Sequence, residues 1–144
     1  VKASRKGEAE YRMIESLLKG VEVPLPPGCS FKDKSGHTRR EARTRWWDTT
    51  ATTYRQAALV PPEDRAQLPD TEIPEHLRLG YTGDKPVFVG HYWMTGQPEI
   101  LAPQVACVDY SAGKGGPLVA YRWSGEPVLS SGNFVLSSDG VHPH

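Results

Sequence analysis

The sequence predicts an α+β fold with an N-terminal helix, an inserted hairpin and a C-terminal mixed or antiparallel sheet of roughly three to five short strands. Two observations carry this prediction. Apolar side chains recur at helical spacing over residues 8–18, and short β-branched or aromatic runs separated by turns follow from residue 87 onward. With 144 residues, the chain has the length of one domain or of a piece of a larger one. Its 14 glycines and 13 prolines predict long loops and short elements.

The first segment of the chain, residues 1–20, is the helix segment, and the helix itself is expected over residues 8–18. One apolar stripe is formed by Tyr11, Ile14, Leu17 and Leu18. Gly20 is expected to end the helix, because glycine adopts the left-handed conformation of a helix C-terminus at little cost.

Residues 21–48 are expected to form an extended segment and a hairpin that acts as a cap region. The alternation of Val21, Val23 and Leu25 predicts a short edge strand, because the neighbouring prolines cannot donate hydrogen bonds within a central one. The hairpin is placed around residues 28–45, with Gly36 providing the positive φ of its turn.

Residues 49–86 are expected to contain a helix and a proline-rich connection. Thr49 or Thr50 caps the helix, which reaches to about residue 59 and ends at the two prolines that follow. Its apolar face is predicted to consist of Tyr54, Ala57 and Ala58. The connection lies on the surface, with one helical turn near residues 63–67.

Residues 87–130 are expected to supply the strands of the sheet, and residues 131–144 a loosely held tail. The individual strands are placed at 86–90, which is expected to be buried, at 105–109 and at 117–123, with a possible return at 127–129.

The charge balance excludes several classes of function. Basic and acidic side chains number 17 each, and the zero net charge argues against general nucleic-acid binding and against an anionic membrane partner. No run of about 18 apolar residues predicts a membrane span. Cys29 and Cys107 do not form a disulfide scaffold, so a cytoplasmic, reducing location is expected. The chain begins with Val1, and the basic residues 2–7 lead into the helix without a capping residue. We therefore expect the chain to be a fragment of a longer protein or a trimmed form of it.

His91 is the first candidate functional residue. It follows an apolar run that ends in Gly90, and strand ends are where many enzymes carry their chemistry. The imidazole is either a metal ligand or general base, or a loop histidine that bonds to backbone.

The glycine-rich run 109–116 is the second candidate. Its backbone N–H groups and Lys114 favour a phosphate, although the spacing does not match a Walker loop. The alternative is a glycine-rich hairpin between two strands.

An arginine and tryptophan cluster is the third candidate. It comprises Arg39, Arg40, Arg43, Arg45, Trp46 and Trp47. Arginine beside aromatic rings suits phosphates and bases, and Arg43 and Arg45 are the residues expected to orient an anionic substrate. The alternative is a solvated hairpin face that Glu41 and Asp48 partly neutralise.

The chain also resembles a known family. Residues 87–93 and 101–123 are similar to the C-terminal part of bacterial calcineurin-like metallophosphoesterases, in the branch of the serine/threonine protein phosphatases and diadenosine tetraphosphatases. Segments 17–25 and 45–47 resemble one bacterial subgroup. In that branch one strand ends in Gly-His, and a later strand gives an Asp and a Gly-Gly turn before an L-x-A-x-R strand. The matching positions are Gly90, His91, Asp109, Gly115, Gly116, Leu118, Ala120 and Arg122.

The resemblance implies that these strands belong to an αββα sandwich in the parent protein. It implies a divalent metal pair of Mn, Fe, Zn or Ni that activates a water for hydrolysis of a phosphate ester or anhydride. The substrate would be a phosphorylated small molecule, a nucleotide or a phosphoprotein. His91 is the one metal ligand carried over, while Trp93 stands where some relatives have a second histidine. Asp109 and Lys114 are expected to shape the loop behind the ligand.

The other ligand motifs of the family, D-x-H and G-D-x-x-D among them, do not occur in this sequence. One imidazole does not hold a metal pair, so this chain alone is expected to bind no metal tightly, to contain no catalytic residue and to lack phosphatase activity. The missing N-terminal half of the same protein would complete the site. The rival hypotheses are a non-catalytic interaction module that uses the hairpin 37–47, and a domain without any site.

Overall fold

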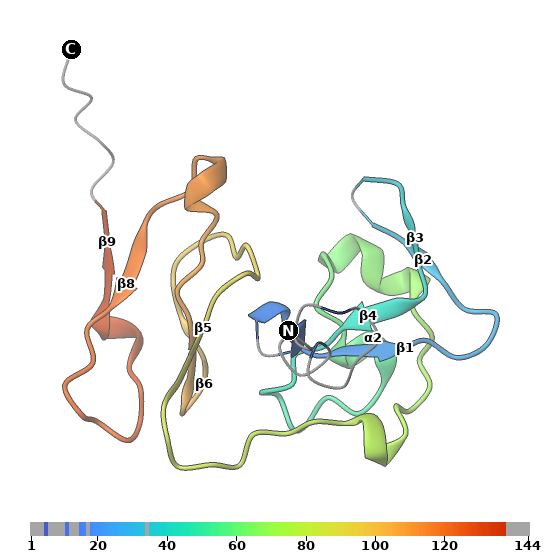
Figure 1. Ribbon diagram of the computed structural model, residues 1–144, viewed down its shortest axis with the longest axis horizontal. Coiled ribbons are helices and arrows are strands. Elements are labelled where there is room, and N and C mark those ends of the chain that lie inside the picture. The colour runs from blue at the N-terminus through green and yellow to red at the C-terminus, as the bar shows by residue number, and fades with distance from the viewer. Residues whose placement is uncertain (1–4, 6–10, 12–14, 17, 34, 138–144) are drawn as a thin grey trace. The chain divides into compact units, whose positions relative to one another are not determined.

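The computed structural model of the chain describes residues 5, 11, 15–16, 18–33 and 35–137 (Figure 1). The contacts divide the chain into two compact units, Val1–Tyr81 and Thr82–His144, and each is described by itself. Short strands and few helices form both units, which is compatible with the predicted α+β class. The expectations of a single domain and of an αββα parent stay predictions.

The predicted N-terminal helix falls largely outside the described residues. Tyr11, Glu15, Ser16, Leu18 and Lys19 are helical. Gly20 has a φ of 88°, and its N–H donates to the Ser16 carbonyl at 3.0 Å, which confirms the predicted end of the helix. Leu18 was expected on the apolar stripe but is 64% exposed. Ile14 and Leu17 lie outside the described residues.

Two antiparallel pairs form the sheet structure of the first unit. β1 (Glu22–Pro24) pairs with β4 (Glu41–Arg43), and the buried side chain of Val23 lies opposite Ala42. β2 (Phe31–Lys32) pairs with β3 (Thr38–Arg39) across a turn in which Gly36 has a φ of 78°. The predicted edge strand and hairpin are therefore confirmed.

The helix of this region is shorter than predicted. α2 (Tyr54–Ala57) is capped by Thr53, which forms a reciprocal capping box with Gln56. The predicted cap at Thr49 or Thr50 is wrong. Thr50 instead donates its hydroxyl and its backbone N–H to the Asp48 carboxylate at 2.7 and 3.1 Å, so it belongs to the preceding turn.

The proline-rich connection contributes to the core, contrary to its predicted place on the surface. It contains the 3₁₀ turns η2 (Pro62–Gln67) and η3 (Glu75–Leu77), of which the first was expected. Leu68 and Ile73 are only 1% and 2% exposed. Backbone hydrogen bonds from Tyr54 to the Thr71 carbonyl and from Ile73 to the Thr52 carbonyl hold the connection against α2. The core combines the buried residues Val23, Leu25, Phe31, Ala42, Tyr54, Ala57, Ala58, Leu68 and Ile73.

The second unit contains a mixed three-stranded sheet and a separate strand pair. The sheet has the order β5-β7-β6, formed by β5 (Val87–Val89), β6 (Ile100–Ala102) and β7 (Val105–Cys107). β5 runs parallel to β7, and β6 antiparallel to it. β8 (Val119–Tyr121) and β9 (Phe134–Leu136) form the antiparallel pair.

Several strand predictions are confirmed and others are wrong. Strands occur within 86–90, 105–109 and 117–123, but β6 was not predicted. β8 pairs with β9 and not with the returning strand that was predicted at 127–129. The prediction of a loosely held tail is therefore wrong for residues 131–137, which contain β9. The serine side chain of Ser130 caps η5 (Ser131–Asn133), which leads directly into β9. β7 is fully buried, whereas β5 was expected to be buried but exposes 40% of Phe88.

Among the described residues, no helix has the length and apolar character needed to cross a membrane.

Candidate functional site at the ends of two parallel strands

His91 and Asp109 lie at the same edge of the three-stranded sheet. Because β5 and β7 are parallel, their carboxyl ends meet there, and each residue follows its strand by two positions. The loops are in close contact, since a Cβ placed on Gly90 would lie 3.9 Å from the Asp109 Cβ. In open α/β sheets such an edge is the usual position of a ligand site. We refer to His91, Trp93, Asp109, Ser111 and Lys114 as the strand-end site.

The backbone of this site is unusual. His91, Trp93 and Ser111 have φ angles of 69°, 49° and 64°, and they are the non-glycine residues with positive φ in the described part of the chain. The left-handed conformation costs an L-residue about 1–2 kcal/mol. Strain of this kind concentrates at functional sites, where the surrounding structure holds it in place.

Asp109 supplies the contacts that hold the two loops. Its carboxylate accepts the backbone N–H of Trp93 at 3.3 Å and that of Ser111 at 3.1 Å. Its backbone carbonyl accepts the N–H of Met94 at 3.0 Å, and the Ser111 hydroxyl donates to the Met94 carbonyl at 3.2 Å. Asp109 therefore holds the two loops together, and its expected role behind a metal ligand stays a prediction.

Three side chains are displayed at the site. His91 is exposed, and its ring centroid lies 6.4 Å from that of Trp93. The Trp93 side chain is 53% exposed, and the Lys114 ammonium sits 3.6 Å from the centroid of its ring. Sequence reasoning assigned no role to Trp93 or Ser111. The exposed aromatic residue two positions after Gly-His was the available signal.

The glycine-rich run is built for a tight turn. It forms η4 (Ala112–Lys114), which is followed by Gly115 with a φ of 87°. A Cβ on Gly116 would lie 2.0 Å from the Tyr110 carbonyl oxygen, so only glycine fits there. β7 and β8 lie in different sheets, and the alternative of a hairpin joining them is therefore wrong.

The described residues do not form a complete metal site. No cluster of three or more His, Cys, Asp or Glu side chains within them is arranged to hold a metal ion. His91 is a suitable single donor, while both oxygens of Asp109 accept backbone hydrogen bonds. Cys107 is buried in β7, and burial raises the pKa of its thiol, which disfavours the thiolate needed for metal binding.

The predicted substrate arginines belong to the first unit and are engaged in ion pairs. Arg43 pairs with Glu22 at 3.0 Å, and Arg45 lies 3.7 Å from the Asp48 carboxylate. Arg45 also donates to the Gln56 carbonyl. The Arg43 pair fastens β4 to β1, and the Arg45 bond to Gln56 ties the segment after β4 to α2. The role of both arginines in substrate binding stays a prediction.

The tryptophans of the same cluster differ in exposure. Trp47 is buried, with 6% of its surface exposed, and makes an edge contact with Trp46 at 5.5 Å between ring centroids. Trp46 also meets Tyr81 edge-on at 6.3 Å. A buried ring cannot stack a base, so Trp47 is not available for recognition, whereas Trp46 is half-buried. The interaction module on the hairpin 37–47 stays a prediction.

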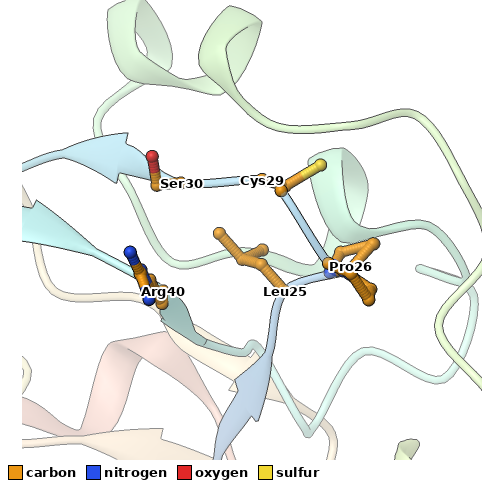
Figure 2. A pocket seen from close by; sticks show the side chains of 7 residues that line it. Leu25, Pro26, Cys29, Ser30 and Arg40 are labelled. Atoms are coloured by element: carbon orange, nitrogen blue, oxygen red, sulfur yellow. The ribbon is translucent and has the colours of Figure 1, made fainter.

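A pocket of about 290 Å³ also lies in the first unit (Figure 2). Its lining consists of Leu25, Pro26, Pro27, Gly28, Cys29, Ser30 and Arg40. Figure 2 shows Leu25 and Pro26 beside the Cys29 segment, with Arg40 as the one charged side chain of the lining. Arg40 belongs to the predicted arginine and tryptophan cluster, whereas Arg43, Arg45 and the residues of the strand-end site do not line this pocket.

Comparison of the chain with protein-family models, with curated proteins and with solved structures finds no match.

Proposed function

We propose that this chain contributes His91 as one metal ligand to a metal-dependent phosphoesterase centre whose remaining ligands come from another segment. The supporting observation is that His91 and the Asp109–Gly116 loop, the two motifs that resemble the metallophosphoesterases, converge at the carboxyl ends of adjacent parallel strands. The sequence motifs are separate along the chain, and nothing in their spacing requires them to meet.

The residues of the chain have distinct roles in this proposal. The imidazole of His91, exposed at the strand end, donates a nitrogen lone pair. Asp109 keeps His91 in place indirectly, because it fixes Trp93, which lies two residues further along the same loop. The metal pair, once bound to the complete centre, supplies an activated water and charge neutralisation for phosphoryl transfer.

The first test is metal binding to the chain itself. Calorimetric titration with Mn²⁺ or Zn²⁺ should give weak binding that His91→Ala removes, and p-nitrophenyl phosphate should be hydrolysed no faster than in a metal blank. Tight binding of two metals, or metal-dependent hydrolysis by these 144 residues, would contradict the proposal of an incomplete site.

The second test uses a longer polypeptide, or a second chain, that supplies the remaining ligands. There His91→Ala should lower phosphatase activity at least about 100-fold. Loss of a residue that only supports a metal ligand lowers activity about 10–100-fold, and loss of the ligand itself should lower it more. Arg43→Ala is the comparison variant, and its effect decides whether that arginine orients substrate. Full activity in the His91→Ala protein would refute the proposed role.

A further inference from the structure

We propose that Lys114, held on the ring of Trp93, forms a binding site for a phosphate dianion at the strand-end site. The inference rests on the proposed function for the identity of the anion, and on the geometry of the described residues for the site itself. It assigns Trp93 the task of holding the cation in position.

The Lys114 ammonium lies over the ring of Trp93. A lysine ammonium normally moves on a flexible four-carbon stem. Here its nitrogen lies 3.6 Å from the Trp93 ring centroid, where the ring quadrupole attracts a cation. The Trp93 backbone is in turn held by the Asp109 carboxylate. The ammonium is therefore anchored to the same loops that carry His91.

Within the part of the chain that the structure describes, no carboxylate forms an ion pair with Lys114. The ion pairs there join other lysines and arginines. The nearby carboxylate of Asp109 is occupied by the N–H groups of Trp93 and Ser111. An exposed, anchored ammonium without a counter-ion favours an anionic ligand.

The neighbouring groups suit an anion with several acceptor oxygens, and the proposed function identifies that anion as phosphate. His91 lies beside the Trp93 ring, at 6.4 Å between centroids, so a cation and an imidazole are both in contact range of one exposed indole. Ammonium and imidazole groups can both donate hydrogen bonds, and a phosphate dianion offers several acceptor oxygens to them. Free phosphate and a phosphate monoester share this chemistry.

The test is a titration of the metal-free chain with inorganic phosphate and, in a parallel arm, with phenyl phosphate, followed by amide and indole N–H signals. The Trp93 indole and residues 111–116 should shift, with a dissociation constant in the millimolar range, as one anchored cation provides. Binding of both compounds indicates recognition of the dianion. Binding of phenyl phosphate alone would show that the aromatic ring, and not the phosphate, is recognised, and would overturn the inference.

Matched variants separate the parts of the site. Lys114→Met should raise the dissociation constant at least about fivefold, whereas Lys114→Arg should raise it less, because the guanidinium keeps the positive charge and also stacks on the indole. Trp93→Leu should weaken binding more than Trp93→Phe. Unchanged signals elsewhere in residues 82–137 verify that each variant is folded. Undiminished binding by Lys114→Met would overturn the inference.

His91→Ala distinguishes this inference from the proposed function. In the metal-free chain it should weaken phosphate binding less than Lys114→Met does, since Lys114 carries the charge and His91 adds one hydrogen bond. If phosphate binds here but His91 takes no metal in the completed centre, the metal role fails and the anion site stands. If His91→Ala abolishes activity there but Lys114→Met binds phosphate normally, only the anion site is refuted.

Discussion

Replacing Asp109 with alanine tests whether this carboxylate holds together the two loops of the strand-end site. It accepts N–H groups from Trp93 at 3.3 Å and from Ser111 at 3.1 Å. A hydrogen bond to a charged acceptor contributes about 1.5–3 kcal/mol. The longer bond belongs at the lower end of this range, and the partial exposure of Asp109 weakens both through solvent screening. We expect Asp109→Ala to lower the free energy of unfolding of the second unit by about 2–4 kcal/mol.

Urea unfolding followed by the amide signals of residues 82–137 measures this effect separately from the first unit. Asp109→Asn retains one acceptor oxygen and loses the charge, so about half of the destabilisation is expected. Both variants should also shift the amide signals of residues 91–94, because the left-handed conformations of His91 and Trp93 lose their support. An Asp109→Ala protein within about 0.5 kcal/mol of the parent, with unchanged signals there, would refute the reasoning.

Two further predictions concern the same unit. Gly116→Ala should destabilise it by at least about 1–3 kcal/mol, because the new Cβ meets the Tyr110 carbonyl oxygen at 2.0 Å. Gly113→Ala is the matched control, since a Cβ there meets nothing within 4 Å; equal stability of the two variants would contradict the packing argument. Glu126 has a pKa below its ordinary value of 4.5, first because its carboxylate accepts the backbone N–H of Ser124. A lowered folded-state pKa contributes stability above pH 4.5 that is lost as the pH falls through the folded-state pKa. Glu126→Gln should therefore be less stable than the parent at pH 7, and thermal unfolding should show the difference shrinking in acid; a difference that does not depend on pH would exclude this linkage.

The strands that could be predicted are those whose side chains carry a clear β pattern. Val105–Cys107 lies in an apolar run, and Val119–Tyr121 contains a β-branched and an aromatic residue; both form where expected. Ile100–Ala102 is also apolar, but so short a run does not by itself distinguish a strand from other structure, and its pairing with β7 decides the outcome. Phe134–Leu136 lies in a segment rich in serine and glycine, and this composition led to the prediction of a loose tail although the three residues themselves favour a strand.

The sequence identified individual residues of the candidate site but did not predict that they lie together. His91 and Asp109 were recognised because each lies where an apolar run ends and a polar segment containing glycine begins. Their adjacency depends on the parallel pairing of β5 with β7, and a parallel pair leaves no local turn signal. The Lys114–Trp93 contact depends in addition on left-handed backbone at Trp93, which residue preferences argue against.

The strand order β5-β7-β6 has a consequence for the sequence of events during folding. β6 and β7 are joined by two residues and can pair locally, whereas β5 pairs with residues of β7 that lie 18 positions further along the chain. We therefore expect β5 to add last, and the Val87 and Val108 amides, which bond across β5 and β7, to become protected late in pulsed hydrogen exchange. Early protection of both amides would reverse this order. The sheet edge that carries His91 would then be the last part of the unit to acquire its native geometry, and the first to lose it.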